Sequence, residues 1–174
     1  MSAKKPADKI TKELALFGVP LLAAYLFIMF YEAGFAAFFG IPVDMISIDI
    51  THVVLTNRTT LVVAVIAFLW IGLYYNILPS TNSPFFKLMI TITLVVSLAL
   101  GVTFGRSDAK NQSTFLVIKT QQEQVVLRIY KDKIITAPFS RADKQVYQSF
   151  YIHNIGDHPD WLYHLEKIGP FYTK

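Results

Sequence analysis

The residues of this chain best suited to binding a ligand are basic and aromatic, and they gather in its C-terminal third. Arg and Lys pair with phosphate oxygens, and aromatic faces stack on bases. Arg128 is the most informative, because it lies in the middle of a predicted hairpin strand and not at its tip. The alternative is an ordinary solvated sheet face with lysines at its turns. The predicted ligand-binding set comprises Lys119, Arg128, Tyr130, Lys133, Arg141, Lys144, His153 and Trp161.

A second group of residues lies within or beside long apolar segments. A carboxylate in a lipid-embedded helix costs on the order of a few kcal/mol unless it faces the bundle interior or water. Glu32 therefore predicts either a pore lining or an interhelical hydrogen bond. Asp44 and Asp49 either ring a pore mouth or are ordinary acids at headgroup level. Gly101 and Gly105 form a G-x-x-x-G pair, which lets helices approach closely and fits a bundle or an oligomer.

No motif in the sequence predicts an enzyme. The absence of Cys removes disulfides, thiolate catalysis and Cys-based metal sites. His153, His158 and His164 are spaced by five and six residues, which does not place them on one helix face. Phosphate loops, nucleophile elbows and kinase signatures are all missing. We therefore expect no catalytic activity, no metal and no cofactor.

The composition indicates a membrane protein. The chain has 174 residues, of which 53% are hydrophobic and 16% charged, whereas a soluble domain carries roughly a quarter charged residues. About 20 apolar residues in a helix cross a bilayer. After a basic tail at residues 1–13, we predict a transmembrane domain at 14–105 with three helices. Its spans lie at about 14–38, 59–78 and 86–105.

The first predicted span is overlong, and Pro42 is expected to stop it. The segment from Gly40 to His52 should then lie along the membrane surface. Three spans put the two termini on opposite sides of the membrane. The basic residues flanking the spans divide five to four between the sides, so the positive-inside rule leaves the orientation open. A re-entrant segment would place both termini inside.

Beyond a polar linker at residues 106–113, the pattern changes from helical to alternating, and residues 114–174 predict a small soluble domain. The predicted fold class is a membrane α-helical bundle of three transmembrane helices followed by a small α+β domain with an antiparallel meander sheet. So small a domain buries a marginal core, which pairing with copies of itself would relieve. Strands are expected at 115–119, 124–130, 133–139 and 146–152, and a short helix at 161–167 with Asp160 as its N-cap.

Two motifs resemble those of small bacterial inner-membrane proteins. The first is Phe-Tyr-Glu-Ala-Gly-Phe-Ala-Ala-Phe-Phe-Gly-Ile-Pro at 30–42, and the second is Val-Leu-Arg-Ile-Tyr-Lys-Asp-Lys-Ile-Ile at 126–135 together with Glu-Lys-Ile-Gly-Pro at 166–170. In size and arrangement the chain is also similar to the short membrane effectors of type III CRISPR defence. This resemblance implies a helical membrane domain and a small cytoplasmic domain that binds a cyclic oligoadenylate messenger and perturbs the membrane. No ligand residues of that family can be aligned with this chain, so none are carried over.

Two functions are therefore expected. The first is an antiviral membrane effector, in which a cyclic oligoadenylate binds the basic C-terminal domain and triggers pore opening or membrane disruption. Residues 106–174 carry ten basic and seven acidic residues, which suits an anionic ligand. Its partners would be the lipid bilayer of a bacterial inner membrane, the ligand and copies of itself, such as a tetramer, but not DNA. The second is a non-enzymatic structural or immunity-type membrane protein whose C-terminal domain binds a protein partner.

Overall fold

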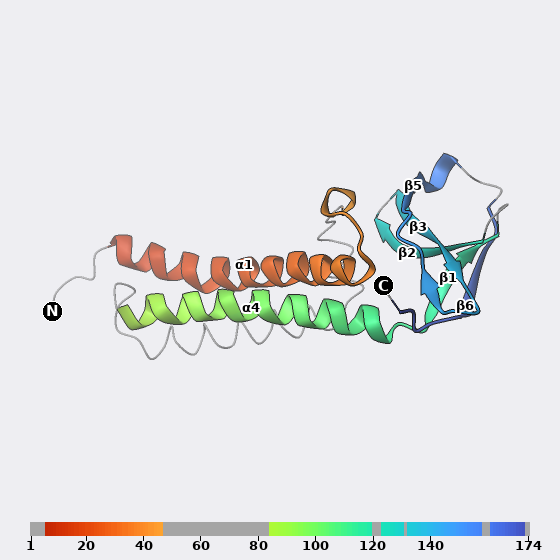
Figure 1. Cartoon of the computed structure of the whole chain (residues 1–174). Helices are drawn as coiled ribbons and strands as arrows, with labels where there is room; N and C mark the ends of the chain where they lie inside the picture. Colours follow the sequence, from red (N-terminus) through yellow and green to blue (C-terminus); the bar gives the residue numbers. More distant parts are fainter. Residues whose placement is uncertain (1–5, 47–83, 120–122, 131, 158–160, 173–174) are drawn as a thin grey trace. The chain divides into compact units, whose positions relative to one another are not determined.

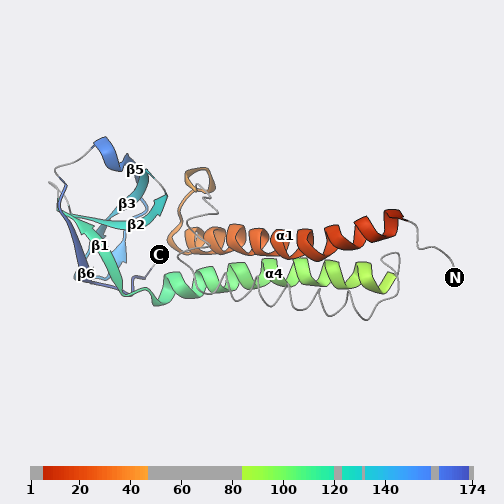
Figure 2. The ribbon, with the colours of Figure 1, turned by 180° about the vertical axis from the view of Figure 1, so that it is seen from behind.

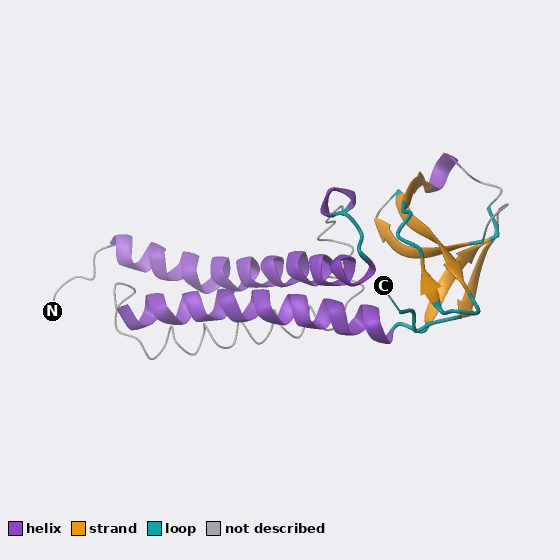
Figure 3. Cartoon of the chain, in the orientation of Figure 1, coloured by secondary structure: helices purple, strands orange, loops and turns teal. Residues whose placement is uncertain are grey.

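The computed structural model describes residues 6–46, 84–119, 123–130, 132–157 and 161–172. Two long helices, α1 (Pro6–Phe39) and α4 (Pro84–Asn111), run side by side in the same direction (Figures 1 and 2). The 3-10 helix η1 (Val43–Met45) follows α1. The strands, orange in Figure 3, are β1 (Thr114–Ile118), β2 (Gln124–Tyr130), β3 (Lys133–Ser140), β4 (Gln145–Val146), β5 (Tyr151–Asn154) and β6 (Tyr163–Lys167), with the 3-10 helix η2 (Ile155–Asp157) after β5.

The chain divides into two compact units. The helical unit comprises Met1–Phe30 and Ile50–Gly101, and the C-terminal unit comprises Tyr31–Asp49 and Val102–Lys174. The last turns of both α1 and α4 therefore belong with the sheet. The predicted boundary at residue 106 came a few residues late, and it left out the end of α1 altogether.

A glycine ends α1. Gly40 has a φ of 77°, and the N–H of Ile41 donates to the carbonyl of Ala36 at 2.9 Å. This is the hydrogen bond of a Schellman cap, in which a residue without Cβ adopts the left-handed conformation. The stop is therefore Gly40, two residues before the predicted Pro42, and the end of α1 at Phe39 agrees with the predicted end of the first span.

The predicted linker at residues 106–113 is wrong, because α4 continues through it to Asn111. On this extension Gly105 and Ala109 are buried, whereas the polar residues between them are exposed. The polar composition therefore marks the solvent side of a helix whose other side packs. Only Gln112 and Ser113 separate α4 from β1.

Two described segments are long and apolar enough to cross a membrane, Leu21–Phe39 and Lys87–Asn111. They correspond to the first and third predicted spans. The second predicted span, at 59–78, lies outside the described residues, as do Asp49 and residues 47–52 of the predicted surface segment. The described part of the chain thus contains two of the three predicted helices.

The sheet is antiparallel, with the strand order β4-β3-β2-β1-β6, and β5 also pairs with β3. β1, β2 and β3 confirm the predicted meander. The predicted fourth strand is instead two short strands, β4 and β5. The predicted helix at 161–167 is wrong: this segment contains β6, in which Leu165 lies opposite Leu116 of β1. After β6, Tyr172 forms an isolated bridge to Gln145 of β4.

Apolar side chains cover both faces of the sheet. On one face, Phe35 and Phe39 of α1 pack with Phe115 and Phe171 in the main core, and the Phe115 and Phe171 ring centroids are 4.9 Å apart. Burial of one such side chain stabilises the fold by about 1.5–3 kcal/mol. The main core of the C-terminal unit therefore includes the end of α1. The other face carries a smaller cluster of Ile118, Val126 and Ile134, against which Leu116 and Trp161 pack.

Candidate functional site

The structure brings together two residues singled out in the sequence, Glu32 of α1 and Arg128 of β2. The Arg128 Nε donates to Glu32 Oε2 at 3.1 Å, and the Tyr130 hydroxyl donates to the same oxygen at 3.0 Å. Arg128 and Tyr130 are two positions apart on one strand, so they project from the same face. Glu32 is only 4% exposed. These three residues are called the Glu32 junction below.

The guanidinium of Arg128 also lies on an aromatic ring. Its Cζ is 3.3 Å from the ring centroid of Phe35, which follows Glu32 by three residues and so shares its helix face. The buried Nη2 of Arg128 has no hydrogen-bond acceptor among the described residues. A cation over an aromatic face is stabilised by about 0.5–2 kcal/mol. Arg128 is therefore held by a carboxylate and a ring from the same helix.

The C-terminal ends of α1 and α4 are in close contact next to the Glu32 junction. The Tyr31 hydroxyl donates to Asp108 Oδ2 at 2.6 Å. A Cβ at Gly105 would collide with the carbonyl oxygen of Tyr31, and one at Gly34 with that of Val102. Gly105 therefore lies where the backbones of the two helices come close together.

Burial and charge fix the protonation of Tyr130. Its pKa is raised well above the ordinary value, first by burial and then by the charge and hydrogen bond of Glu32. Tyr130 therefore remains a hydrogen-bond donor at ordinary pH. Removing one partner of a buried ion pair costs about 3–5 kcal/mol. The junction is therefore suited to clamping β2 onto α1, and a displacement of β2 must break it.

Arg141 lies at the end of β3 and is engaged by two carboxylates. Its Nε donates to Glu123 at 2.9 Å and its Nη1 to Glu166 of β6 at 2.7 Å. These hydrogen bonds, Glu166 first, raise the pKa of Arg141, and the bond from Arg141 lowers the pKa of Glu166. The positive charge predicted here for ligand binding is therefore compensated within the chain.

His153 and Trp161 lie on the other face of the sheet from the Glu32 junction. His153 is opposite Ile134 and Arg128 opposite Ile135, and neighbouring residues of β3 project to opposite faces. The His153 and Trp161 rings meet edge to face with centroids 4.6 Å apart. This aromatic pair borders the smaller apolar cluster.

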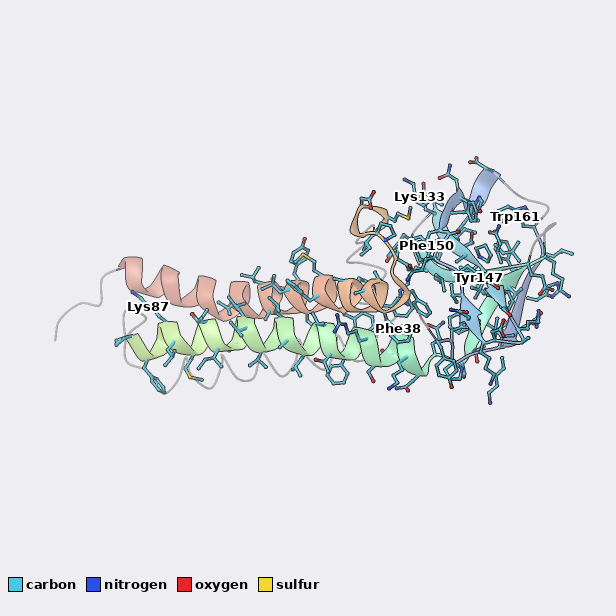
Figure 4. The ribbon with its side chains drawn as sticks, viewed as in Figure 1. Phe38, Lys87, Lys133, Tyr147, Phe150 and Trp161 are labelled. Atoms are coloured by element: carbon cyan, nitrogen blue, oxygen red, sulfur yellow. The ribbon has the colours of Figure 1, made fainter. Side chains whose placement is uncertain are left out.

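The predicted ligand-binding set therefore does not form one surface. Arg128 and Tyr130 are in the junction, Arg141 is in its carboxylate pair, and His153 and Trp161 are on the opposite face. The three lysines of the set are exposed at strand ends or turns. Lys133, at the start of β3, lies apart from Trp161, which precedes β6 (Figure 4). Asp44 is exposed in η1, and Gly101 is buried in α4. The lysines are Lys119, Lys133 and Lys144.

Three residues that complete the site were not predicted: Tyr31, Phe35 and Asp108. Phe35 follows Tyr31 by four residues and Glu32 by three, and both spacings make helix neighbours, so the sequence does contain this signal. Asp108 follows Gly105 by three residues, but it lay within the segment taken for a linker. A helical reading of residues 101–111 would have placed it beside α1.

Comparison of the chain with protein-family models, with curated proteins and with solved structures finds no match. Within the described ranges, no group of three or more His, Asp or Glu side chains is placed to hold a metal ion. The function of the chain is therefore inferred from its own residues and their geometry.

Proposed function

We propose that the protein is a membrane-anchored effector whose C-terminal sheet receives a ligand and passes its binding to the helices. The observation that carries this proposal is the Glu32 junction. It ties a central strand of the sheet to α1, the helix that contains the apolar segment Leu21–Phe39, which is long enough to cross a bilayer.

Helix lengths support anchoring in a membrane. α1 has 34 residues and α4 has 28, which at about 1.5 Å per residue gives roughly 51 and 42 Å. A hydrocarbon core is about 30 Å thick. Residues 31–39 and 102–111 belong to the C-terminal unit. If they lie outside the hydrocarbon, 25 residues of α1 and 18 of α4 remain, which span about 38 and 27 Å. Glu32 then lies outside the hydrocarbon. Its burial is by protein side chains and not by lipid.

Two further observations fit anchoring. In the apolar window of α4, 17% of the residues are buried within the structure, far fewer than in the core helix of a soluble domain. α1 and α4 also run in the same direction (Figure 1), as the first and third of three successive spans would. In this proposal the exposed apolar residues of α4, such as Leu88 and Val95, face lipid or another helix.

For the ligand we propose an anion of the cyclic oligoadenylate class. The net positive charge of residues 106–174 and the exposed Lys119, Lys133 and Lys144 support an anionic ligand. Arg128 acts in coupling and not in ligand contact, because Glu32 already holds its guanidinium. Binding changes the membrane only if the ligand prefers one arrangement of the sheet, and a full switch requires a preference of several kcal/mol.

Dye release from liposomes tests this proposal. The full chain is reconstituted, and cyclic oligoadenylates of different ring size are added from the side that carries the C-terminal unit. One ring size should release the dye. Glu32→Gln should bind that ring with similar affinity but release less dye, whereas the control Asp157→Asn, at an exposed position of η2, should behave as the wild type. If no ring size binds the reconstituted chain in calorimetry, the ligand assignment is wrong.

A second function, binding of a protein partner, is favoured by exposed apolar side chains around β5. Tyr151, Ile152 and Ile155 are 45%, 45% and 39% exposed. Apolar surface gathered in this way is typical of interaction sites. Fusions of the C-terminus to alkaline phosphatase and to green fluorescent protein separate the two functions. A periplasmic C-terminus would exclude a cytoplasmic messenger and leave the partner-binding function.

A further inference from the structure

β6 has an open edge. It is the terminal strand in the sheet order and pairs along its whole length with β1, the one described strand beside it. An edge strand presents backbone N–H and C=O groups that can pair with another strand. Proteins usually protect such an edge with charges or with a covering element, so the side chains of β6 indicate what the edge meets.

Apolar side chains stand at this edge. Leu165, in the middle of β6, is 71% exposed, and Leu162, just before it, is 67% exposed. Leu165 projects from the same face as Leu116 on β1, which packs on the smaller apolar cluster. A second Leu beside Leu165 would therefore extend an apolar surface that the fold already builds.

We infer that β6 pairs in antiparallel orientation with β6 of a second copy of this chain, centred on Leu165. The sequence of β6, Tyr-His-Leu-Glu-Lys, is complementary to itself in this register. Leu165 lies opposite the partner's Leu165, and His164 lies opposite the partner's Glu166. Tyr163 lies opposite the partner's Lys167, where a cation can meet an aromatic face. Such a pairing is two-fold symmetric, as in most protein dimers.

Other symmetric registers are less favourable. Centring on Glu166 places two carboxylates opposite each other, and centring on His164 leaves Glu166 opposite the partner's Leu162, where no polar partner meets it. Like charges directly opposite destabilise a pair of strands, whereas opposite charges and apolar pairs stabilise it. Glu166 already accepts a hydrogen bond from Arg141 at 2.7 Å, but a carboxylate has about four acceptor sites and can accept a second donor. The register centred on Leu165 is therefore selected.

A five-residue edge buries less surface than a stable soluble dimer requires, which is about 1,200–2,000 Å². The inference therefore rests on the proposed anchoring, because tethering both copies to one membrane raises their effective concentration. Cell fractionation tests the anchoring separately. A chain found in the soluble fraction contradicts the anchoring, whereas a membrane-bound chain without β6 contact contradicts the pairing alone.

Cysteine cross-linking in membranes tests the pairing directly, because the chain has no Cys of its own. Opposite Cβ atoms of antiparallel strands are about 4.5–5.5 Å apart, close to disulfide range. Mild oxidation of the Leu165→Cys protein should give a disulfide-linked dimer. Leu162→Cys is the matched control: it is similarly exposed but lies opposite the partner's Ile168, so its dimer band should be lost. His164→Cys and Glu166→Cys, carried on two differently tagged chains, should cross-link to each other.

Charge changes distinguish this register from chance contact. In the Leu165→Cys protein, His164→Glu should reduce the cross-linked fraction about tenfold, because each copy then places Glu opposite Glu. His164→Lys should preserve the cross-link, which also shows that position 164 tolerates substitution. Equal cross-linking at positions 162 and 165 would overturn the inference. So would a Leu165→Cys protein that is folded and membrane-bound but stays monomeric, or that cross-links only to a different protein.

Discussion

Replacing Arg128 with Met should destabilise the C-terminal unit strongly. The change removes the positive partner of Glu32 but keeps an unbranched apolar stem against Phe35. The Glu32 side chain is 5% exposed and that of Arg128 is 21% exposed, so the group left without its counter-charge is the more deeply buried one. Breaking a buried pair costs about 3–5 kcal/mol, and Tyr130 still donates to Glu32, so we expect about 3 kcal/mol. For a unit of this size, that lowers the Tm by roughly 12–24 °C.

The reverse change should cost less. Glu32→Gln leaves the charge on Arg128, which reaches water, and we expect a loss of about 1 kcal/mol. The double variant Glu32→Leu/Arg128→Met should recover most of the stability, because an apolar pair needs no counter-charge. Thermal unfolding of the full chain in detergent is monitored by proteolytic cleavage within β2 and β3. This gives the unfolding midpoint of each of the three variants. If Arg128→Met lowers the midpoint no more than Glu32→Gln does, the assignment of the buried pair is wrong.

Three further changes test other contacts. Tyr130→Phe removes the hydroxyl that donates to Glu32 and should lower the free energy of unfolding by about 1.5–3 kcal/mol in the same assay, whereas Tyr172→Phe, at an exposed position, should have little effect. Gly105→Ala should weaken the packing of the two helices and lower the midpoint, because its Cβ collides with backbone; Gly18→Ala, with open space around it, should not. Because Arg141 lowers the pKa of Glu166, the pair stabilises the fold above the ordinary Glu pKa and loses this contribution as the pH falls through the lowered pKa. Wild-type stability should therefore fall more steeply with acid than that of Glu166→Gln, and parallel pH profiles would contradict the pair.

Much of the fold follows from local pattern, and the errors have identifiable causes. The three meander strands alternate clearly and were predicted correctly. The segment 161–167 was predicted as a helix because Asp160 before it is a favoured N-cap residue, but pairing with β1, nearly fifty residues earlier, makes Tyr163–Lys167 a strand. The end of α4 was taken for a linker because its exposed residues are polar. Its buried positions, Gly101, Gly105 and Ala109, recur every four residues and contained the helical signal.

The candidate site was found only in part. Glu32 was singled out because a carboxylate in an apolar helix requires a partner, and Arg128 because it lies in the middle of a strand. Their hydrogen bond joins positions 96 residues apart. No local sequence pattern indicates such a pairing. The predicted basic surface failed for the same reason, since the register of β3 with β5 and with β2 decides which face each side chain takes.

The glycine contacts between α1 and α4 limit how the C-terminal unit can move. At Gly105 and Gly34 the backbone of one helix lies directly against the other. If either helix turned about its own axis, a side chain would be driven into the backbone of its neighbour. The remaining motions are sliding along the shared axis and displacement of the two ends together. A change that begins at Glu32 must therefore move the ends of α1 and α4 together as a rigid body. These two helix ends are then the smallest group of residues in the unit that can move independently.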